Sequence, residues 1–131
     1  MTWVQSFRRT ALASAMLLAA ASALAGAAAA QTVESIKKGG VLKIGSQVSQ
    51  VPWGFSDASG KLTGFDIELG EMLAKDLGVK AEVTPVTSSN RVAALLTGQV
   101  DVLAAVMGIF ADRQKVVLFS RPYTTNDTIY I

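Results

Sequence analysis

The sequence predicts an α/β domain in which helices flank a mostly parallel sheet on both faces. Short apolar runs of strand length alternate along the chain with longer stretches in which apolar residues recur at helical spacing. Glycine, serine and asparagine residues separate the two kinds of segment. Because strands joined through helices re-enter a sheet in the same direction, this alternation favours parallel pairing.

Residues 1–30 have the features of a signal peptide that is cleaved near Ala30. Two arginines precede an apolar run of mostly alanine and leucine, and small residues close the segment. A cut after Ala25 is an open alternative. The apolar run is too short and too rich in alanine to favour a membrane anchor. We therefore expect export to the periplasm, with residues 31–131 forming one domain.

The charge and composition of the chain exclude several classes of function. The chain has twelve basic and ten acidic residues, and Arg8 and Arg9 belong to the expected leader. The remainder is neutral, so nothing favours nucleic-acid binding. The chain has no histidine and no cysteine, which removes the commonest zinc ligands, most nucleophile and base pairs, and any lipid attachment through cysteine. We expect no metal, no cofactor and no catalytic residues.

The first half of the domain is expected to hold two strands and a long helix. A short helical turn over 31–38 ends at two glycines, and a buried strand follows over 41–45. The loop over 46–61 is long for a compact domain, which is typical of a functional loop. A helix is expected over 64–77, with Gly78 as its left-handed cap and a strand over 79–84 after it. Its expected buried face consists of Phe65, Leu69, Met72, Leu73 and Leu77.

The second half repeats the alternation in shorter elements. Ser88 or Ser89 is expected to cap a helix that Gly98 ends, with an apolar edge of valine and leucine residues. A buried strand is predicted over 100–105, a helical turn over 112–115 and another strand over 116–119. A further extended segment begins at Thr124. It stops in the middle of an apolar run at Ile131, so the chain is expected to be incomplete.

Arg113 is the sharpest candidate for a binding residue. It follows a strand of an α/β unit, and such sheets bind ligands at the carboxyl ends of their strands. A guanidinium group can grip a carboxylate with two parallel hydrogen bonds. The alternative is a solvated arginine that pairs with Asp112 or Asp101. Trp53 and Phe55, in the long loop, can form an apolar wall of a pocket or plug the core.

Other polar residues favour structural roles. Asp66 is expected to cap its helix rather than to contact a ligand. Arg91 could bind an anion, but its place on the polar edge of a surface helix favours a structural role. Asp101 is expected to hold the turn before its strand. No glycine-rich phosphate motif is present, and no carboxylate pair or serine-centred group suggests catalysis.

Several stretches in fixed order resemble lobe 1 of the family 3 extracellular solute-binding proteins, the periplasmic components of amino-acid ABC importers. The resemblance covers residues 40–123. The matching stretches are 41–45, 52–55, 62–69, 77–79, 90–92, 96–102, Arg113 and 119–123.

The resemblance implies a two-lobed clamp that closes on an amino acid and delivers it to a permease in the inner membrane. In lobe 1 the arginine matching Arg113 would hold the α-carboxylate, with help from backbone groups near Val106, Met107 and Gly108. Many relatives have hydroxyl residues here, where this chain has Gly108 and Phe110, so the ligand can differ.

Trp53, Phe55 and Gln47 complete the expected site. Gln47 replaces an acid that relatives binding basic amino acids often carry, which argues against a cationic ligand side chain. The chain would end inside the first hinge strand. Two other functions are compatible with the resemblance: an enzyme similar to cyclohexadienyl dehydratases, or a sensor lobe of a larger receptor or lytic enzyme.

Overall fold

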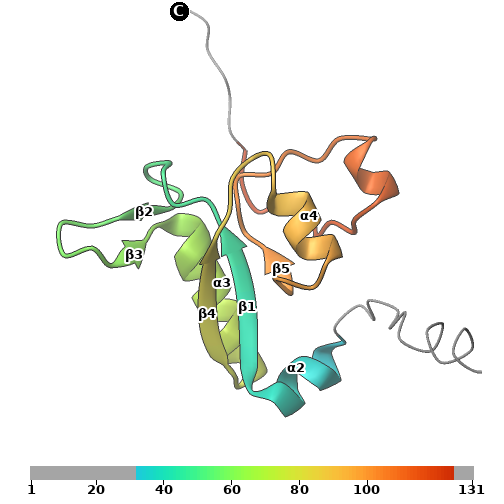
Figure 1. The fold of residues 1–131 in the computed structure, drawn as a ribbon, viewed down its shortest axis with the longest axis horizontal. Coiled ribbons are helices and arrows are strands. Elements are labelled where there is room, and N and C mark those ends of the chain that lie inside the picture. The colour runs from blue at the N-terminus through green and yellow to red at the C-terminus, as the bar shows by residue number, and fades with distance from the viewer. Residues whose placement is uncertain (1–31, 126–131) are drawn as a thin grey trace, which may run out of the picture.

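The computed structural model describes residues 32–125 and confirms the predicted α/β architecture (Figure 1). Three parallel strands form the sheet in the order β4-β1-β5. The central strand β1 spans Val41–Ser46 and pairs along its full length with β4, Lys80–Pro85. On its other side it pairs with the short strand β5, Val102–Leu103. The sheet is therefore narrow and parallel, and its central strand is buried.

Helix α3, Phe65–Leu77, packs on one face of the sheet together with the short helix α2, Val33–Gly39. The contact is close because α3 presents Gly70 to the sheet. A Cβ at this position would lie 2.7 Å from Cγ2 of Ile44, which is too near for a side chain. The core on this face consists of Ile36, Leu42, Ile44, Ala74 and Ala104.

Helix α4, Arg91–Leu96, covers the opposite face, so the expectation of helices on both faces is confirmed. Gly45 of β1 leaves room there, because a Cβ at this position would lie 2.6 Å from Leu103 and 3.2 Å from Val100. The second core cluster consists of Val86, Ala94, Val100 and Ala105. None of the helices between residues 32 and 125 is long and apolar enough to cross a membrane.

The predicted buried face of α3 is wrong in part: Leu77 packs against the core and Leu69 is half-buried, but the other three residues are exposed. The bounds of the helix and its left-handed cap at Gly78 are confirmed. The buried apolar residues of α3 are Ile67, Gly70 and Ala74. Of the larger residues expected inside, Met72 is 63% exposed. Gly70 and Ala74 at the contact allow the helix to approach the strands closely, and three of the expected bulky side chains lie on its outer side. The exposed ones are Phe65, Met72 and Leu73.

Two expectations for the second half are also wrong. Asn90, not a serine, stands at the N-cap of α4, and its side chain accepts a hydrogen bond from the N–H of Thr87 at 2.8 Å instead of capping the helix. The segment 116–119 is not a strand, and Leu118 is 98% exposed. Within residues 32–125 no neighbouring strand pairs with this segment, so its backbone groups have no partner strand for hydrogen bonds of a β-sheet.

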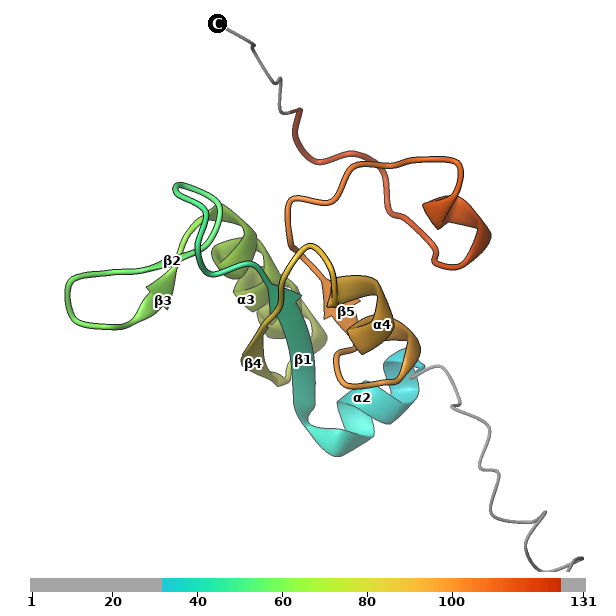
Figure 2. The ribbon, with the colours of Figure 1, turned by 45° about the horizontal axis from the view of Figure 1, so that its top comes forward.

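The long loop after β1 has its own structure. It contains a cis peptide bond between Val51 and Pro52 and a bridge between Gln50 and Gly54. A two-stranded antiparallel hairpin follows, formed by β2, Phe55–Ser56, and β3, Leu62–Thr63. Figure 2 shows this loop and the segment after β5 beyond the same end of the sheet, the end at which β1 points. The two segments are therefore placed to form a site together.

Replacing Gly54 with Ala is expected to lower the free energy of unfolding by about 3 kcal/mol. A Cβ at this position would lie 1.9 Å from the carbonyl oxygen of Gln47, so the backbone of the loop has to move. Urea denaturation measures the change. Gly39→Ala is the matched control, because no atom lies within 4 Å of its added Cβ. Equal stability of the two variants would contradict the tight packing of this loop.

A candidate ligand-binding cavity

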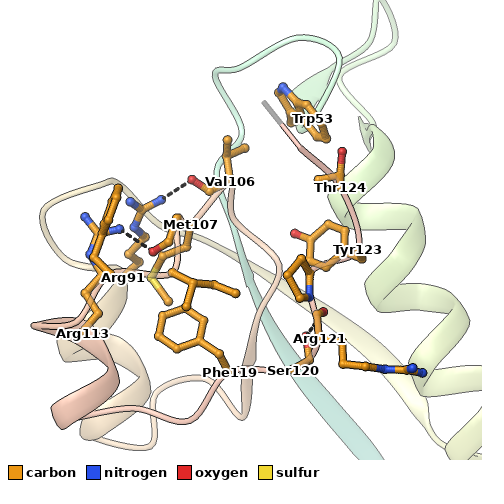
Figure 3. Close-up of a pocket in the computed structure, with 14 residues that line it drawn as sticks. Trp53, Arg91, Val106, Met107, Arg113, Phe119, Ser120, Arg121, Tyr123 and Thr124 are labelled. Carbon is orange, nitrogen blue, oxygen red and sulfur yellow. Dashed lines mark hydrogen bonds between the residues drawn. The ribbon is translucent and has the colours of Figure 1, made fainter. Parts of the chain in front are cut away.

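A cavity of about 520 Å³ lies between the segment that follows β5 and the loop that follows β1 (Figure 3). Its lining residues come mainly from the two segments that lie beyond the carboxyl ends of the parallel strands, where α/β sheets usually bind ligands. Its wall combines arginine, aromatic and aliphatic side chains with exposed backbone. The lining residues are Trp53, Arg91, Val106, Met107, Gly108, Ile109, Phe110, Arg113, Phe119, Ser120, Arg121, Pro122, Tyr123 and Thr124.

Arg113 lies at the start of the 3-10 helix η1, Arg113–Lys115, which confirms the predicted helical turn. Its Nη1 donates a hydrogen bond to the carbonyl oxygen of Gly108 at 3.1 Å. The guanidinium carbon lies 4.9 Å from the centre of the Phe110 ring, a cation–π contact that fixes the side chain. Asp101 does not pair with it, because its Oδ2 accepts a hydrogen bond from the N–H of Lys43. The remaining guanidinium N–H groups of Arg113 are free to hold an anion within the described part of the chain.

Arg91 is a second cation of the cavity wall. It was expected on a surface helix, yet it is only 5% exposed. Its Nη1 donates hydrogen bonds to the carbonyl oxygens of Ala105 and Val106 and to Oε1 of Gln47. Burial, and then the positive charge of Arg113, lower its pKa. Arg91 therefore has a structural role, but in the interior and beside the candidate anion site.

Asp66 also holds the segment that follows β5, through Val106. It was expected to cap α3, but Gly64 is the N-cap and no side chain bonds there. The carboxylate is 1% exposed and accepts hydrogen bonds from the N–H of Val106 at 2.8 Å and from the hydroxyl of Tyr123 at 2.9 Å. Val106 adopts φ +49°, a conformation unfavourable for a β-branched residue. Asp66 and Arg91 together hold Val106 in this strained geometry by its N–H and its carbonyl group.

The backbone beyond Val106 offers donors to a ligand. Within residues 32–125, the N–H groups of Met107, Gly108 and Ile109 make no hydrogen bond. Gly108 is held directly under the Phe110 ring, since a Cβ there would lie 2.9 Å from Cε2 of Phe110. A short run of unpaired N–H groups next to a guanidinium group is suited to bind a carboxylate.

Aromatic side chains form the opposite wall. Trp53 packs edge-on against Phe65 with ring centres 5.6 Å apart, and Phe65 stacks on Tyr123 at 6.1 Å. Figure 3 shows Trp53 and Tyr123 across the cavity from Arg91 and Arg113. This places an apolar surface against a cationic one, which suits a small ligand with both kinds of group.

The structure brings five of the seven expected binding residues to the cavity: Arg113, Gly108, Val106, Met107 and Trp53. Gln47 and Phe55 are not among the lining residues. The amide of Gln47 lies behind the wall, where it donates to Ser88 and accepts from Arg91. Phe55 is a residue of the β2–β3 hairpin. Between residues 32 and 125 no group of three acidic, histidine or cysteine side chains could hold a metal ion.

The phenol of Tyr123 is expected to make stability depend on alkaline pH. Burial, and then the negative charge and hydrogen bond of Asp66, raise its pKa above the ordinary value of 10.0. The folded protein thus keeps a proton that the unfolded chain loses, and the free energy of unfolding falls as the pH rises above about 10. Tyr123→Phe should flatten this decline in urea denaturation between about pH 9 and pH 11. An unchanged decline in the variant would contradict the Asp66–Tyr123 contact.

Three comparisons with known proteins bear on this site. The family description "Bacterial extracellular solute-binding proteins, family 3" matches residues 42–131. The chain is 36% identical over 92 residues to the L-cystine-binding protein TcyJ of Escherichia coli strain K12, which covers 70% of this chain and 35% of that protein. It is 31% identical over 121 residues to a cyclohexadienyl dehydratase of Pseudomonas aeruginosa, which covers 91% of this chain and 44% of that enzyme.

Among solved structures, the arginine-bound Phe57Trp mutant of domain 1 from TmArgBP superposes with a TM-score of 0.69 at 35% identity. The match covers 71% of this chain and 72% of that domain. The chain therefore corresponds to most of an isolated domain 1, but it spans only about a third of the length of TcyJ.

Proposed function

The chain belongs to the bacterial extracellular solute-binding proteins of family 3, and we propose that it binds an amino acid or similar small carboxylate for delivery to an ABC importer. Relatives named for cystine, histidine and glutamine binding support an amino acid as the ligand. We propose the periplasm as its location, with residues 1–30 as the signal peptide. A permease in the inner membrane is the proposed partner.

The observation that carries the proposal is the arrangement of Arg113 with the free backbone donors of Met107, Gly108 and Ile109. Arg113 is already oriented by Gly108 and Phe110, so little side-chain freedom is lost when a carboxylate binds. The guanidinium group and the N–H groups supply charge-assisted hydrogen bonds. The apolar surface around Trp53 is proposed to contact the rest of the ligand.

The domain 1 structure supports binding by this lobe. That domain is described as an arginine-bound form although it is a single domain of its protein. A single domain similar to this chain therefore supports the binding of an amino acid by one lobe. In a two-lobed protein, closure of a second lobe would bury the ligand further and strengthen binding.

Calorimetric titration with a panel of L-amino acids tests the proposal. The panel contains cystine, glutamine, histidine, arginine, glutamate and aspartate. At least one should bind saturably with a Kd below about 100 µM, which corresponds to a binding free energy of about −5.5 kcal/mol. The absence of binding by every member, for protein shown by its cooperative thermal transition to be folded, would overturn the proposal.

A second candidate is an enzyme on the same fold, favoured by the match to cyclohexadienyl dehydratase over 91% of the chain. The two functions differ in turnover, not in fold. Incubation with prephenate and chromatography of the products separates them. We expect no turnover, because within residues 32–125 no acidic side chain lines the cavity to act as a general acid.

A further inference from the structure

The wall of the cavity carries an excess of positive charge. Three arginines line it, Arg91, Arg113 and Arg121, and among residues 32–125 no aspartate or glutamate does. Figure 3 shows the guanidinium group of Arg121 pointing away from the other two. The carboxylate of Asp66 touches two wall residues, through the N–H of Val106 and the hydroxyl of Tyr123, and makes no direct contact with an arginine within residues 32–125. No acid in the described part of the wall therefore forms an ion pair with the arginines.

Arg91 shows the excess most clearly, because its charge is buried without a counter-ion. The acceptors that it reaches are two backbone carbonyl oxygens and the amide oxygen of Gln47, which are all neutral. Its Nε is buried and has no hydrogen-bond partner within residues 32–125. A buried cation with neutral partners alone is costly, and a neutral amide side chain could also hold carbonyl groups. A functional use of the charge would explain why an arginine stands here.

Arg91 and Arg113 both line the cavity. Figure 3 shows their guanidinium groups side by side on one wall, and the positive charge of Arg113 disfavours the charged form of Arg91. A single carboxylate on Arg113 neutralises one of the two charges. A second anionic group on the ligand would neutralise the other.

We infer that the cavity takes a ligand with two carboxylates, such as an acidic amino acid, one held by Arg113 and the other attracted by Arg91. The inference rests on the proposed function and names the substrate class of that same site. A cavity of about 520 Å³ is ample for a molecule of this size. The aromatic wall at Trp53 would contact the aliphatic carbons between the two carboxylates.

Calorimetric titration with two matched pairs of ligands tests the inference. L-glutamate and L-glutamine differ by one carboxylate, as do L-aspartate and L-asparagine, and L-arginine serves as the cationic comparison. In at least one pair the acid should bind about tenfold tighter or more than its amide, and L-arginine should bind more weakly than that acid. Amides that bind as tightly as both acids, or L-arginine as the tightest ligand, would overturn the inference.

Arg91→Gln identifies the residue that reads the second carboxylate. The variant should reduce the preference for the acid over its amide to about threefold or less. Because Arg91 also holds the carbonyl group of Val106, the affinities for the acid and the amide should both fall, and their ratio is the readout. Lys115→Gln is the control, because Lys115 is exposed and does not line the cavity. An unchanged preference in a folded Arg91→Gln protein would remove Arg91 from the inference. If the variant does not fold, the two ligand pairs on the unmodified protein decide.

The same titrations separate this inference from the proposed function. Binding of a neutral or cationic amino acid that depends on Arg113, without any preference for acids, would leave the proposed function standing and refute the dicarboxylate inference. The absence of binding by any of the five ligands and by the rest of the panel would refute both.

Discussion

Replacing Arg113 with Ala is expected to weaken ligand binding by about tenfold to a hundredfold. The guanidinium group is the proposed charged partner of the ligand carboxylate, and hydrogen bonds to charged groups contribute about 1.5–3 kcal/mol. The side chain is partly exposed and its own structural contacts are limited to Gly108 and Phe110. The fold should therefore survive the change, and the loss should appear in binding alone.

Lys115→Ala is the matched control for this variant. Lys115 belongs to the same helical turn, carries the same charge and does not line the cavity. Calorimetric titration should give a Kd within about twofold of the unmodified protein for Lys115→Ala and a much larger Kd for Arg113→Ala. Equal losses of affinity in the two variants would show that only the general electrostatic field affects binding, which would contradict a direct contact between Arg113 and the ligand carboxylate.

The largest expected effect on stability comes from Asp66→Ala, which should lower the free energy of unfolding by about 3 kcal/mol. The change leaves the N–H of Val106 and the hydroxyl of Tyr123 without their acceptor in a partly buried place. Val106 is then no longer held at φ +49°, so the segment that carries the free backbone donors is expected to relax. Ligand affinity should therefore fall together with stability.

Urea denaturation measures the loss, with Glu71→Ala as the control on the same helix. Glu71 is exposed, and its removal should change stability by less than about 0.5 kcal/mol. Asp66→Asn, which keeps one acceptor oxygen, should fall between the two. An Asp66→Ala protein as stable as Glu71→Ala would contradict the role of Asp66 in holding the loop.

The elements defined by local signals could be predicted from the sequence. The bounds of α3 follow from its spacing and from Gly78, whose φ of +73° meets the requirement for a left-handed cap. The strand 41–45 is a short apolar run, and it became the central strand of the sheet. The place of Arg113 followed from topology, because a loop after a parallel strand lies at the edge where ligands bind.

The predictions that failed concern features that depend on contacts between distant segments of the chain. Periodicity alone assigns bulky residues to the buried face of α3, but the sheet accepts Gly70 and Ala74 because the helix lies close to Ile44. The segment 116–119 has the composition of a strand, yet strand formation needs a partner, and none pairs with it in residues 32–125.

The roles of Arg91 and Asp66 could not be predicted for a related reason. Their partners are backbone groups of the loop after β5, 14 or more residues away in the chain, and any sequence supplies such groups. A buried arginine that binds carbonyl oxygens has no signature in a single sequence. The residues that shape the cavity are thus harder to identify from the sequence than Arg113, the proposed ligand-binding residue.

The central claim is that Arg113 and the adjacent backbone donors hold the carboxylate of an amino acid. Its most direct test is a calorimetric comparison of the tightest-binding amino acid with its α-amide, on the unmodified protein and on Arg113→Ala. The α-amide should bind at least about tenfold more weakly to the unmodified protein, and the difference should disappear in the variant. An α-amide that binds the unmodified protein as tightly as the free acid would contradict the claim.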